Sequence, residues 1–532
     1  MSKFWGVFFA VGCGDKGGAT DTSPGLDADA DTDTDSDTDT DADTDLLTYG
    51  PTVTTAEKCP LVPIVSLTAA RPVSVTVSDG THTASSPEAL THAVALFDFV
   101  PGVATTFSVE IVELTGETTT REVDWTPESL PSDQWPNVDV PVADAGKMSP
   151  GLTVLPVGTL FNPGWHYLVA FDEEGLVHWL YEGETQFDDF EITQEGNILY
   201  LDGAGITEMD WACQPINQFT WEDNDDGVGS VVPDTILFHH EVSKLSDGTY
   251  LVLDHEKLEF ASFPVEYQDL GNLEDADVDV SVLIRFDSSG TVLERLSFAD
   301  VFDPSRIGWD SLNTGEAYPT AYDWVHGNSA QWVESENAYL LSARQQDAVA
   351  LYDRDTSTVS WVLGNPENWS PEFEALRLVA DGSVDWFYHQ HAATLNEDGT
   401  LTLFDNGNVR VSPPDVPSGL PYSRAVQYRV DGNNVSQDWE FVQTSEGEVF
   451  CAAGGDVDTL PNGNVLSSCA FGKSLDGEDH TDAGFGDSCA RVSEFDPVTG
   501  TPVFELMLTS DVSDNPNGWF TVRSARVEHV GP

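Results

Sequence analysis

The chain has 532 residues, which is enough for two or three domains, each with its own hydrophobic core. It contains 92 Asp and Glu residues against 21 Lys and Arg residues, and its formal net charge at pH 7 is −71. A surface this negative repels nucleic acids and anionic lipid headgroups. The composition therefore argues against a nucleic-acid-binding protein and against a polyanionic nucleotide as substrate.

Residues 1–13 have the pattern of a lipoprotein signal peptide. Lys3 supplies a positive charge, residues 4–11 form a short apolar run, and small residues lead into Cys13 as they do in a lipobox. The apolar run is too short to span a bilayer. We expect an exported protein that touches the membrane only through a lipid on Cys13. It would reside at the outer membrane, in the periplasm or on the cell surface.

Residues 14–58 are expected to form an acidic, disordered linker. Asp occupies every odd position from 27 to 45 and alternates with Ala, Thr and Ser. Like charges without apolar partners repel one another and favour an extended chain. The glycine turn and distal glutamate of an EF-hand loop are absent, so these residues do not predict a specific calcium site.

Five cysteines remain after Cys13. An exported protein meets an oxidising compartment, in which disulfides form and persist. Cys451, Cys469 and Cys489 lie near one another in the sequence, and we expect one disulfide among these three.

Residues 59–125 alternate apolar and polar positions between turn residues, as in 72–77 and 106–112. This is the periodicity of strands that bury one face. We predict a small antiparallel β-sandwich over residues 59–125. Residues 126–149 are rich in Pro, Asp and Ser and are predicted to form a linker.

Residues 150–532 contain a loose repeat made of two kinds of hairpin. One kind is an apolar strand that ends in Asp and a glycine turn, as in residues 283–290. The other has Asn-Gly or Asp-Gly at its turn, as in 460–464, and these dipeptides suit the positive φ of tight hairpins. The units recur every roughly 50–75 residues, which suggests four-stranded blades arranged radially. We predict an all-β fold in which a propeller of about six blades follows the sandwich.

Five of the 12 histidines and one arginine stand at the ends of predicted strands. They are His239, His240, His326, His389, His391 and Arg344. The innermost strand of each propeller blade lines the central channel, so equivalent positions of successive blades converge near the axis. We therefore expect these side chains to meet. Strand alternation also predicts that His389 and His391 share one face.

The order and spacing of these segments resemble the arylsulfotransferase family, which transfers a sulfuryl group between phenols without an adenylyl sulfate donor. The matching motifs are His240-Glu241, His326-Gly327-Asn328, Ser342-Ala343-Arg344, Gln390-His391, Phe404-Asp405-Asn406-Gly407 and Tyr422-Ser423-Arg424. The resemblance covers about residues 150–530. One family feature is missing, because no cysteine lies between Arg344 and His391, where family members carry a short-loop disulfide.

The resemblance implies a ping-pong mechanism without a cofactor or a metal. His391 would attack the sulfur and become sulfohistidine. Arg344 would hold two sulfuryl oxygens with its planar fork, while His240 and His326 would donate to the oxygens and deprotonate the acceptor. The residues expected to contact the substrate are His239, His389, Asn328 and Tyr388. The expected partners are small-molecule phenols and aryl sulfates, and a homodimer is compatible with the sequence.

Two other functions fit part of the pattern. His-His and His-x-His pairs can chelate zinc or copper, although Arg344 in the same cluster would repel a cation. A propeller can also keep its fold and bind a ligand or partner without catalysis, since a fold does not determine a function.

Overall fold

The computed structural model describes residues 46–531 except 132–133, 160–163, 225–226, 316, 417–420, 443–448, 475–488 and 510–517. Cys13 and the Asp-rich run lie outside the described residues. The described part is nearly all β, and its single α-helix is the four-residue α1 (Pro371–Glu374). Nowhere in that part is a helix long and apolar enough to cross a membrane.

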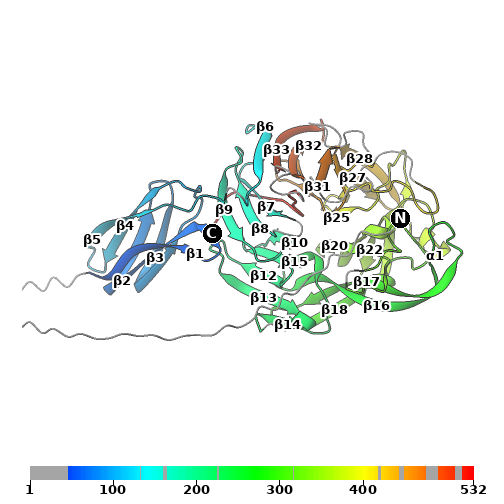
Figure 1. Ribbon diagram of the computed structural model, residues 1–532, viewed down its shortest axis with the longest axis horizontal. Coiled ribbons are helices and arrows are strands. Elements are labelled where there is room, and N and C mark those ends of the chain that lie inside the picture. Colours follow the sequence, from blue (N-terminus) through cyan, green and yellow to red (C-terminus); the bar gives the residue numbers. More distant parts are fainter. Residues whose placement is uncertain are drawn as a thin grey trace, which may run out of the picture.

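The prediction of a propeller of about six blades is confirmed, because the described residues of the propeller form six sheets arranged in a ring (Figure 1). Blade 1 consists of β34 (Ala525–Val527), β7 (Leu152–Gly158), β8 (His166–Phe171) and β9 (Val177–Glu182). Blade 2 consists of β10 (Phe187–Ile192), β11 (Ile198–Asp202), β12 (Gly205–Met209), β13 (Pro215–Trp221) and β14 (Ser230–Val232). Blade 3 consists of β15 (His239–Lys244), β16 (Tyr250–Pro264), β17 (Leu273–Phe286), β18 (Val292–Ser297) and β19 (Tyr322–Asp323).

The other three blades are likewise built on antiparallel strands, with the short β24 added in parallel to blade 5. Blade 4 consists of β20 (Gly327–Val333), β21 (Ala338–Ala343), β22 (Ala348–Asp353) and β23 (Thr358–Gly364). Blade 5 consists of β25 (His391–Leu395), β26 (Thr400–Asp405), β27 (Arg424–Asp431), β28 (Asn434–Phe441) and β24 (Val379–Ala380). Blade 6 consists of β30 (Asp456–Thr459), β29 (Val449–Cys451), β31 (Val465–Ser474), β32 (Cys489–Asp496), β33 (Thr501–Thr509) and β6 (Asn137–Ala143).

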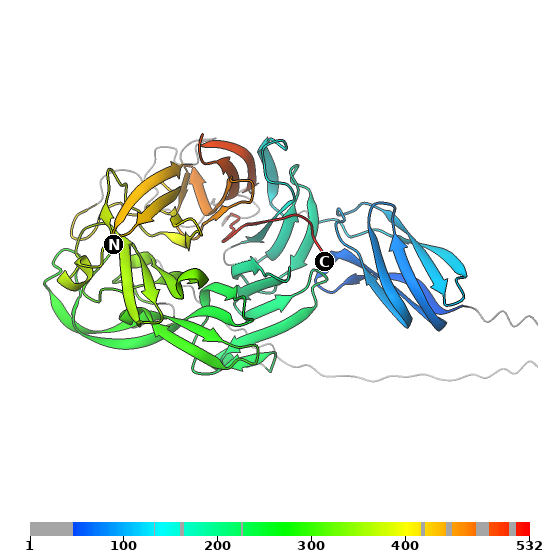
Figure 2. The same cartoon turned by 180° about the vertical axis from the view of Figure 1, so that it is seen from behind.

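Both ends of the propeller sequence close the ring. β6 precedes blade 1 in the chain but pairs with β33 as the outer strand of blade 6. β34 follows blade 6 but pairs with β7 as the inner strand of blade 1. Figure 2 shows the C-terminal segment, in dark red, passing along blade 1 and ending beside the N-terminal domain.

The N-terminal domain is one hydrogen-bonded sheet folded over its own core. Its strands are β1 (Leu47–Ala56), β2 (Cys59–Ser78), β3 (Thr83–Ala95), β4 (Thr105–Glu113) and β5 (Thr118–Trp125). The long β2 pairs with β1 and β3 in its first half and with β3 and β4 in its second half. β1 also contacts β5, so the sheet encloses apolar side chains that include Val75, Phe107 and Trp125.

Two predicted linkers contain strands, and both boundaries were wrong. The linker over 14–58 ends too late, because β1 begins at Leu47 and places Val53 opposite Val65. The linker over 126–149 contains β6, whose Val138 and Val140 pack against the core between blades 1 and 6. In each case Pro, Asp or Thr between the apolar residues masked the alternation of the strand.

Hydrogen bonds connect the inner strands of neighbouring blades. In each, a side-chain oxygen of one inner strand accepts a backbone N–H of the next inner strand. Asp189 of β10 accepts from Val242 of β15 at 2.7 Å, and Glu241 of β15 accepts from Ala330 of β20 at 3.3 Å. Further ties of this kind join Glu191 to Lys244, Ser329 to Ala393 and Gln331 to Leu395. These bonds fix the relative position of the strand starts that carry the histidines.

The N-terminal domain is attached to the propeller covalently and by a charged contact. The disulfide Cys59–Cys213 joins β2 to the turn between β12 and β13. His178 of β9 lies between two carboxylates, with Nδ1 2.5 Å from Asp98 of the N-terminal domain and Nε2 2.9 Å from Asp172 of blade 1.

The His178 contact predicts a pH dependence of stability. The hydrogen bond with Asp98 raises the pKa of His178, so its contribution is complete below the unfolded pKa of about 6.5 and is lost as the pH rises through the folded pKa. The same bond lowers the pKa of Asp98, whose contribution is lost as the pH falls through its folded pKa, below about 3.9. His178→Gln should therefore lower the free energy of unfolding, and with it the unfolding temperature, most near pH 5–6, with a free-energy loss of at most about 1 kcal/mol after solvent screening.

Thermal unfolding of the wild-type protein and of His178→Gln, at pH 5.5 and at pH 9, measures how much the substitution destabilises the fold at each pH. The matched control is His529→Gln, which changes an exposed histidine. An equal effect of His178→Gln at both pH values would contradict the assignment.

Candidate active site

Three histidines from three blades meet where the inner strands begin. The ring centroids of His240 and His326 are 4.8 Å apart, and those of His240 and His391 are 6.5 Å apart. The pairing register shifts at the start of β15, β20 and β25, which is a β-bulge in each strand. A bulge bends the strand and re-aims its side chains. The predicted convergence of His240, His326 and His391 is thus confirmed.

Positive φ angles accompany these bulges. His240 has a φ of 60°, His326 of 44° and Ala392 of 51°, all in the left-handed region. Residues other than glycine adopt this region rarely, and such strained positions cluster at functional sites.

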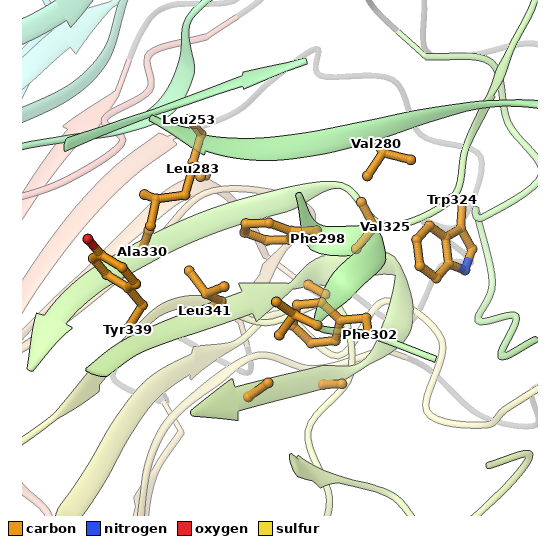
Figure 3. Close-up of a cluster of buried hydrophobic side chains, with 14 of the residues drawn as sticks. Leu253, Val280, Leu283, Phe298, Phe302, Trp324, Val325, Ala330, Tyr339 and Leu341 are labelled. Carbon is orange, nitrogen blue, oxygen red and sulfur yellow. The ribbon is translucent and has the colours of Figure 1, made fainter. Parts of the chain in front are cut away.

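A shared core anchors His326 and Arg344. Trp324 and Val325, directly before His326, are fully buried between blades 3 and 4 with Phe298 (Figure 3). Ala343, directly before Arg344, belongs to the same core, and the Arg344 backbone N–H donates to the carbonyl of His326 at 3.1 Å. The side chain of Arg344 is nearly fully buried, and its Nη1 lies 3.7 Å from a carboxylate oxygen of Asp310.

The hydrogen bonds of His391 define its tautomer. Asn406 donates through Nδ2 to the carbonyls of Cys451 and Gly454, at 2.8 and 2.9 Å. Its Oδ1 therefore faces His391 Nδ1, at 2.7 Å, and must accept a hydrogen bond from a protonated Nδ1. The lone pair of His391 is left on Nε2, where the backbone N–H of Gly454 approaches at 3.3 Å.

His391 is held in its neutral form. Burial is the main cause that moves its pKa well below the usual value, and the nearby charge of Arg344 acts in the same direction. The combination of a neutral ring, an Nε2 lone pair and an adjacent guanidinium is what a nucleophile for an anionic sulfate ester requires.

The other two histidines differ in their partners. Nδ1 of His326 lies 2.6 Å from Asp323, so the carboxylate accepts from Nδ1 and Nε2 points away from it. Asp323 in turn accepts from Gln345 at 3.0 Å. His240 Nδ1 lies 2.9 Å from His239 Nδ1, and burial keeps the pKa of His240 well below its usual value.

Three of the four residues expected to contact substrate are hydrogen-bonded to the surrounding protein. His239 is buried behind His240, with Nε2 3.2 Å from the carbonyl of Asp254. Asn328 is buried and donates to the carbonyl of Gln390 at 2.6 Å, a bond that joins blades 4 and 5. Tyr388 is half-buried, and its backbone N–H donates to Asp405.

His389 does not share a face with His391, and the prediction from strand alternation was wrong. Its φ is 56°, which breaks the extended geometry that alternation assumes. The ring is fully buried, 3.3 Å from Asp310 and 3.4 Å from Asp347. Burial and Arg344 disfavour the charged ring, but the two carboxylates outweigh them and raise the pKa of His389. Asp310 therefore lies between His389 and Arg344.

The sequence-based reasoning missed three residues of the site. Asp323 stands three residues before His326, and Asn406 lies within a quoted motif, so both had a local signal. Arg523 had none, because it follows blade 6 and reaches the centre only through the fold. The disulfide predicted among the last three cysteines is confirmed as Cys451–Cys469.

The sequence left open that these histidines bind a metal ion instead. Among the described residues, no three His, Cys, Asp or Glu side chains are arranged to hold a metal ion.

The fold and site define a six-bladed β-propeller with a histidine–arginine centre at one end of its channel. The profile of the arylsulfotransferase (ASST) family matches residues 138–519, and the chain belongs to this family. The arylsulfate sulfotransferase AssT of Escherichia coli O6:H1 (strain CFT073) is 25% identical over 326 residues, which are 51% of this chain and 52% of that protein. AssT of Lelliottia amnigena is 25% identical over 331 residues, 52% of each chain.

This chain thus spans about half the length of the curated relatives it matches. Among solved structures, a protein of unknown function from Bacteroides caccae has a TM-score of 0.38 at 11% identity, over 70% of this chain and 100% of that chain.

Proposed function

We propose that the protein transfers a sulfuryl group from an aryl sulfate to a phenol through a sulfohistidine at His391. The observation that carries the proposal is the Nε2 lone pair of His391, which Asn406 fixes on a ring whose centroid lies 6.5 Å from that of His240, near the Arg344 charge. The transferring group resembles a phosphoryl group, with negative charge spread over three oxygens.

In the first half-reaction, Nε2 of His391 attacks the sulfur, the N–S bond forms and the bond from sulfur to the aryl oxygen breaks. The aryl oxygen leaves with the electron pair and takes the Nε2 proton of a doubly protonated His326, which becomes neutral and keeps its Nδ1 proton on the side of Asp323. Arg344 neutralises charge on the sulfuryl oxygens. In the second half-reaction, an acceptor phenol gives its proton to the same nitrogen, attacks the sulfur and releases His391.

Transfer from a chromogenic aryl sulfate to a phenol, with purified protein and a chelator present, tests this function. We expect transfer that needs neither a divalent ion nor a nucleotide. Activity that disappears on chelation and returns with one metal ion, in a protein whose fold is unchanged, would favour a metal enzyme instead. Absence of transfer with every aryl sulfate would favour a propeller that only binds.

We also propose that the protein is exported and anchored by a lipid on Cys13. The support is the lipobox pattern and the Asp-rich tether that follows it. Gly14 rather than Asp at the next position favours the outer membrane. Metabolic labelling with a fatty acid should mark the wild-type protein and not Cys13→Ser, whereas labelling of both or of neither would contradict the anchor.

A further inference from the structure

Arg523 lies on the propeller axis and contacts three blades. It stands in the closing segment between β33 and β34. Its guanidinium is 2.6 Å from Asp189 of blade 2, 3.0 Å from Glu241 of blade 3 and 3.3 Å from Asp456 of blade 6. One cation therefore joins carboxylates that the chain places far apart in sequence.

Two of these carboxylates also hold the bulge that carries His240. Glu241 follows His240 directly and accepts the backbone N–H of Ala330 in blade 4. Asp189 accepts the backbone N–H of Val242, two residues after His240. The backbone on the C-terminal side of His240 is thus bonded to groups that Arg523 binds.

The Arg523 charge favours the ionised form of the carboxylates that it binds. Burial raises the pKa of Asp189 and of Glu241, and Arg523 acts against this rise. A planar guanidinium can bind several carboxylates at once, because its five N–H donors lie in a fixed fork. Without it, the carboxylates would repel one another or take up protons.

We propose that Arg523 is a positioning residue for sulfuryl transfer, which fixes His240 at the site by binding Asp189, Glu241 and Asp456 together. The inference rests on the proposed function of the site. Arg523 does not touch the reacting atoms in this arrangement. It acts through the backbone at the His240 bulge and through its charge.

The charge of Arg523 also reaches His391. The groups that face His391 are Arg344, His326, His240, Arg523 and the amide of Asn406. Arg344, His326 and Arg523 all disfavour a proton on the ring, whereas Asn406 favours it. Removing Arg523 should therefore make His391 easier to protonate.

The decisive variant is Arg523→Gln, which removes the charge. We expect kcat/KM for the aryl sulfate to fall ~10²-fold, as is typical when a catalytic group is displaced by about 1 Å. The acid limb of its pH profile should move to higher pH, because His391 must be neutral to attack and loses a positive charge that disfavours its protonation. Arg523→Lys should restore the acid limb, since it keeps the charge, but only part of the rate, since it lacks the fork.

The matched control is Arg526→Gln. Arg526 lies in β34, directly after the closing segment. Its side chain is 3% exposed, and its ion pair is with Glu494 at 2.9 Å and not with the carboxylates that Arg523 binds. The Arg526→Gln substitution should lower the unfolding temperature and leave the acid limb of the pH profile unchanged. An equal shift in both variants would mean that ring closure alone matters, and would overturn the proposal. The proposal would also be overturned if Arg523→Gln had the same rate and the same acid limb of the pH profile as the wild-type protein.

NMR titration of ¹⁵N-histidine-labelled full chain, without substrate, separates this inference from the proposed function. His391→Asn assigns the signal. The imidazole pKa of His391 should be higher in Arg523→Gln than in wild type, and an unchanged value would overturn the inference. A wild-type protein that transfers no sulfuryl group would refute the proposed function, whatever the titration shows. If Arg523→Gln does not fold, a full rate in Arg523→Lys would overturn the positioning role.

Discussion

His391→Asn is expected to abolish sulfuryl transfer, with a loss of at least about 10⁴-fold in kcat, as for removal of a nucleophile. If Nε2 of His391 attacks the sulfur, the wild-type protein supplied with donor but no acceptor should release a burst of one phenol per active site. It should also gain the mass of one sulfuryl group. Asn lacks the lone pair that Asn406 and Gly454 position on the imidazole.

Rapid-mixing kinetics measure the burst, and peptide mapping at high pH locates the adduct. The control is His389→Asn, which changes a buried histidine between Asp310 and Asp347 and should leave the adduct on His391. An adduct on His240, His326 or His389 would show that another ring is the nucleophile. Transfer without any adduct would refute the covalent mechanism.

Arg344→Lys should reduce kcat by roughly 10²–10³, which corresponds to about 2–4 kcal/mol of lost transition-state stabilisation. Lysine keeps the positive charge but offers a single ammonium group instead of a planar fork. The backbone hydrogen bond from Arg344 to His326 does not depend on the side chain, so the substitution should keep the backbone in place and change the contacts of the guanidinium with Asp310 and with the proposed sulfuryl oxygens.

The matched control is Arg354→Lys, which changes a partly exposed arginine that follows β22 of the same blade and pairs with Glu294 of blade 3. It should retain wild-type turnover. Near-wild-type turnover of Arg344→Lys would instead assign Arg344 a structural role between blades.

The blades and the central histidines could be predicted because their signals are local. Hairpin turns such as those at Gly399 and Gly463 have the positive φ that their sequences demand. His240, His326 and His391 each mark the start of an inner strand, and topology alone brings such positions together. The roles of Asn406 and Asp323 could be recognised only in the structure. A motif or an i, i+3 spacing does not reveal which side-chain atom faces which histidine ring.

Other features could not be read from local pattern. β6 pairs with β33, which lies at the opposite end of the propeller sequence, so nothing near residues 137–143 marks them as part of blade 6. His389 departs from alternation through a single φ angle. Cys59 and Cys213 are 154 residues apart, and only the docking of the N-terminal domain brings them together.

The double closure by β6 and β34 has a consequence for folding kinetics. Each of these pairings closes a loop that contains nearly the whole propeller, and the entropy of such closure must be lost before the contacts form. The blades between them can pair locally as they are made. The ring, and with it Arg523 at the axis, can be completed only after the last strand is available. Until then β33 and β7 are open strand edges, which makes the unfinished ring the form most exposed to aggregation.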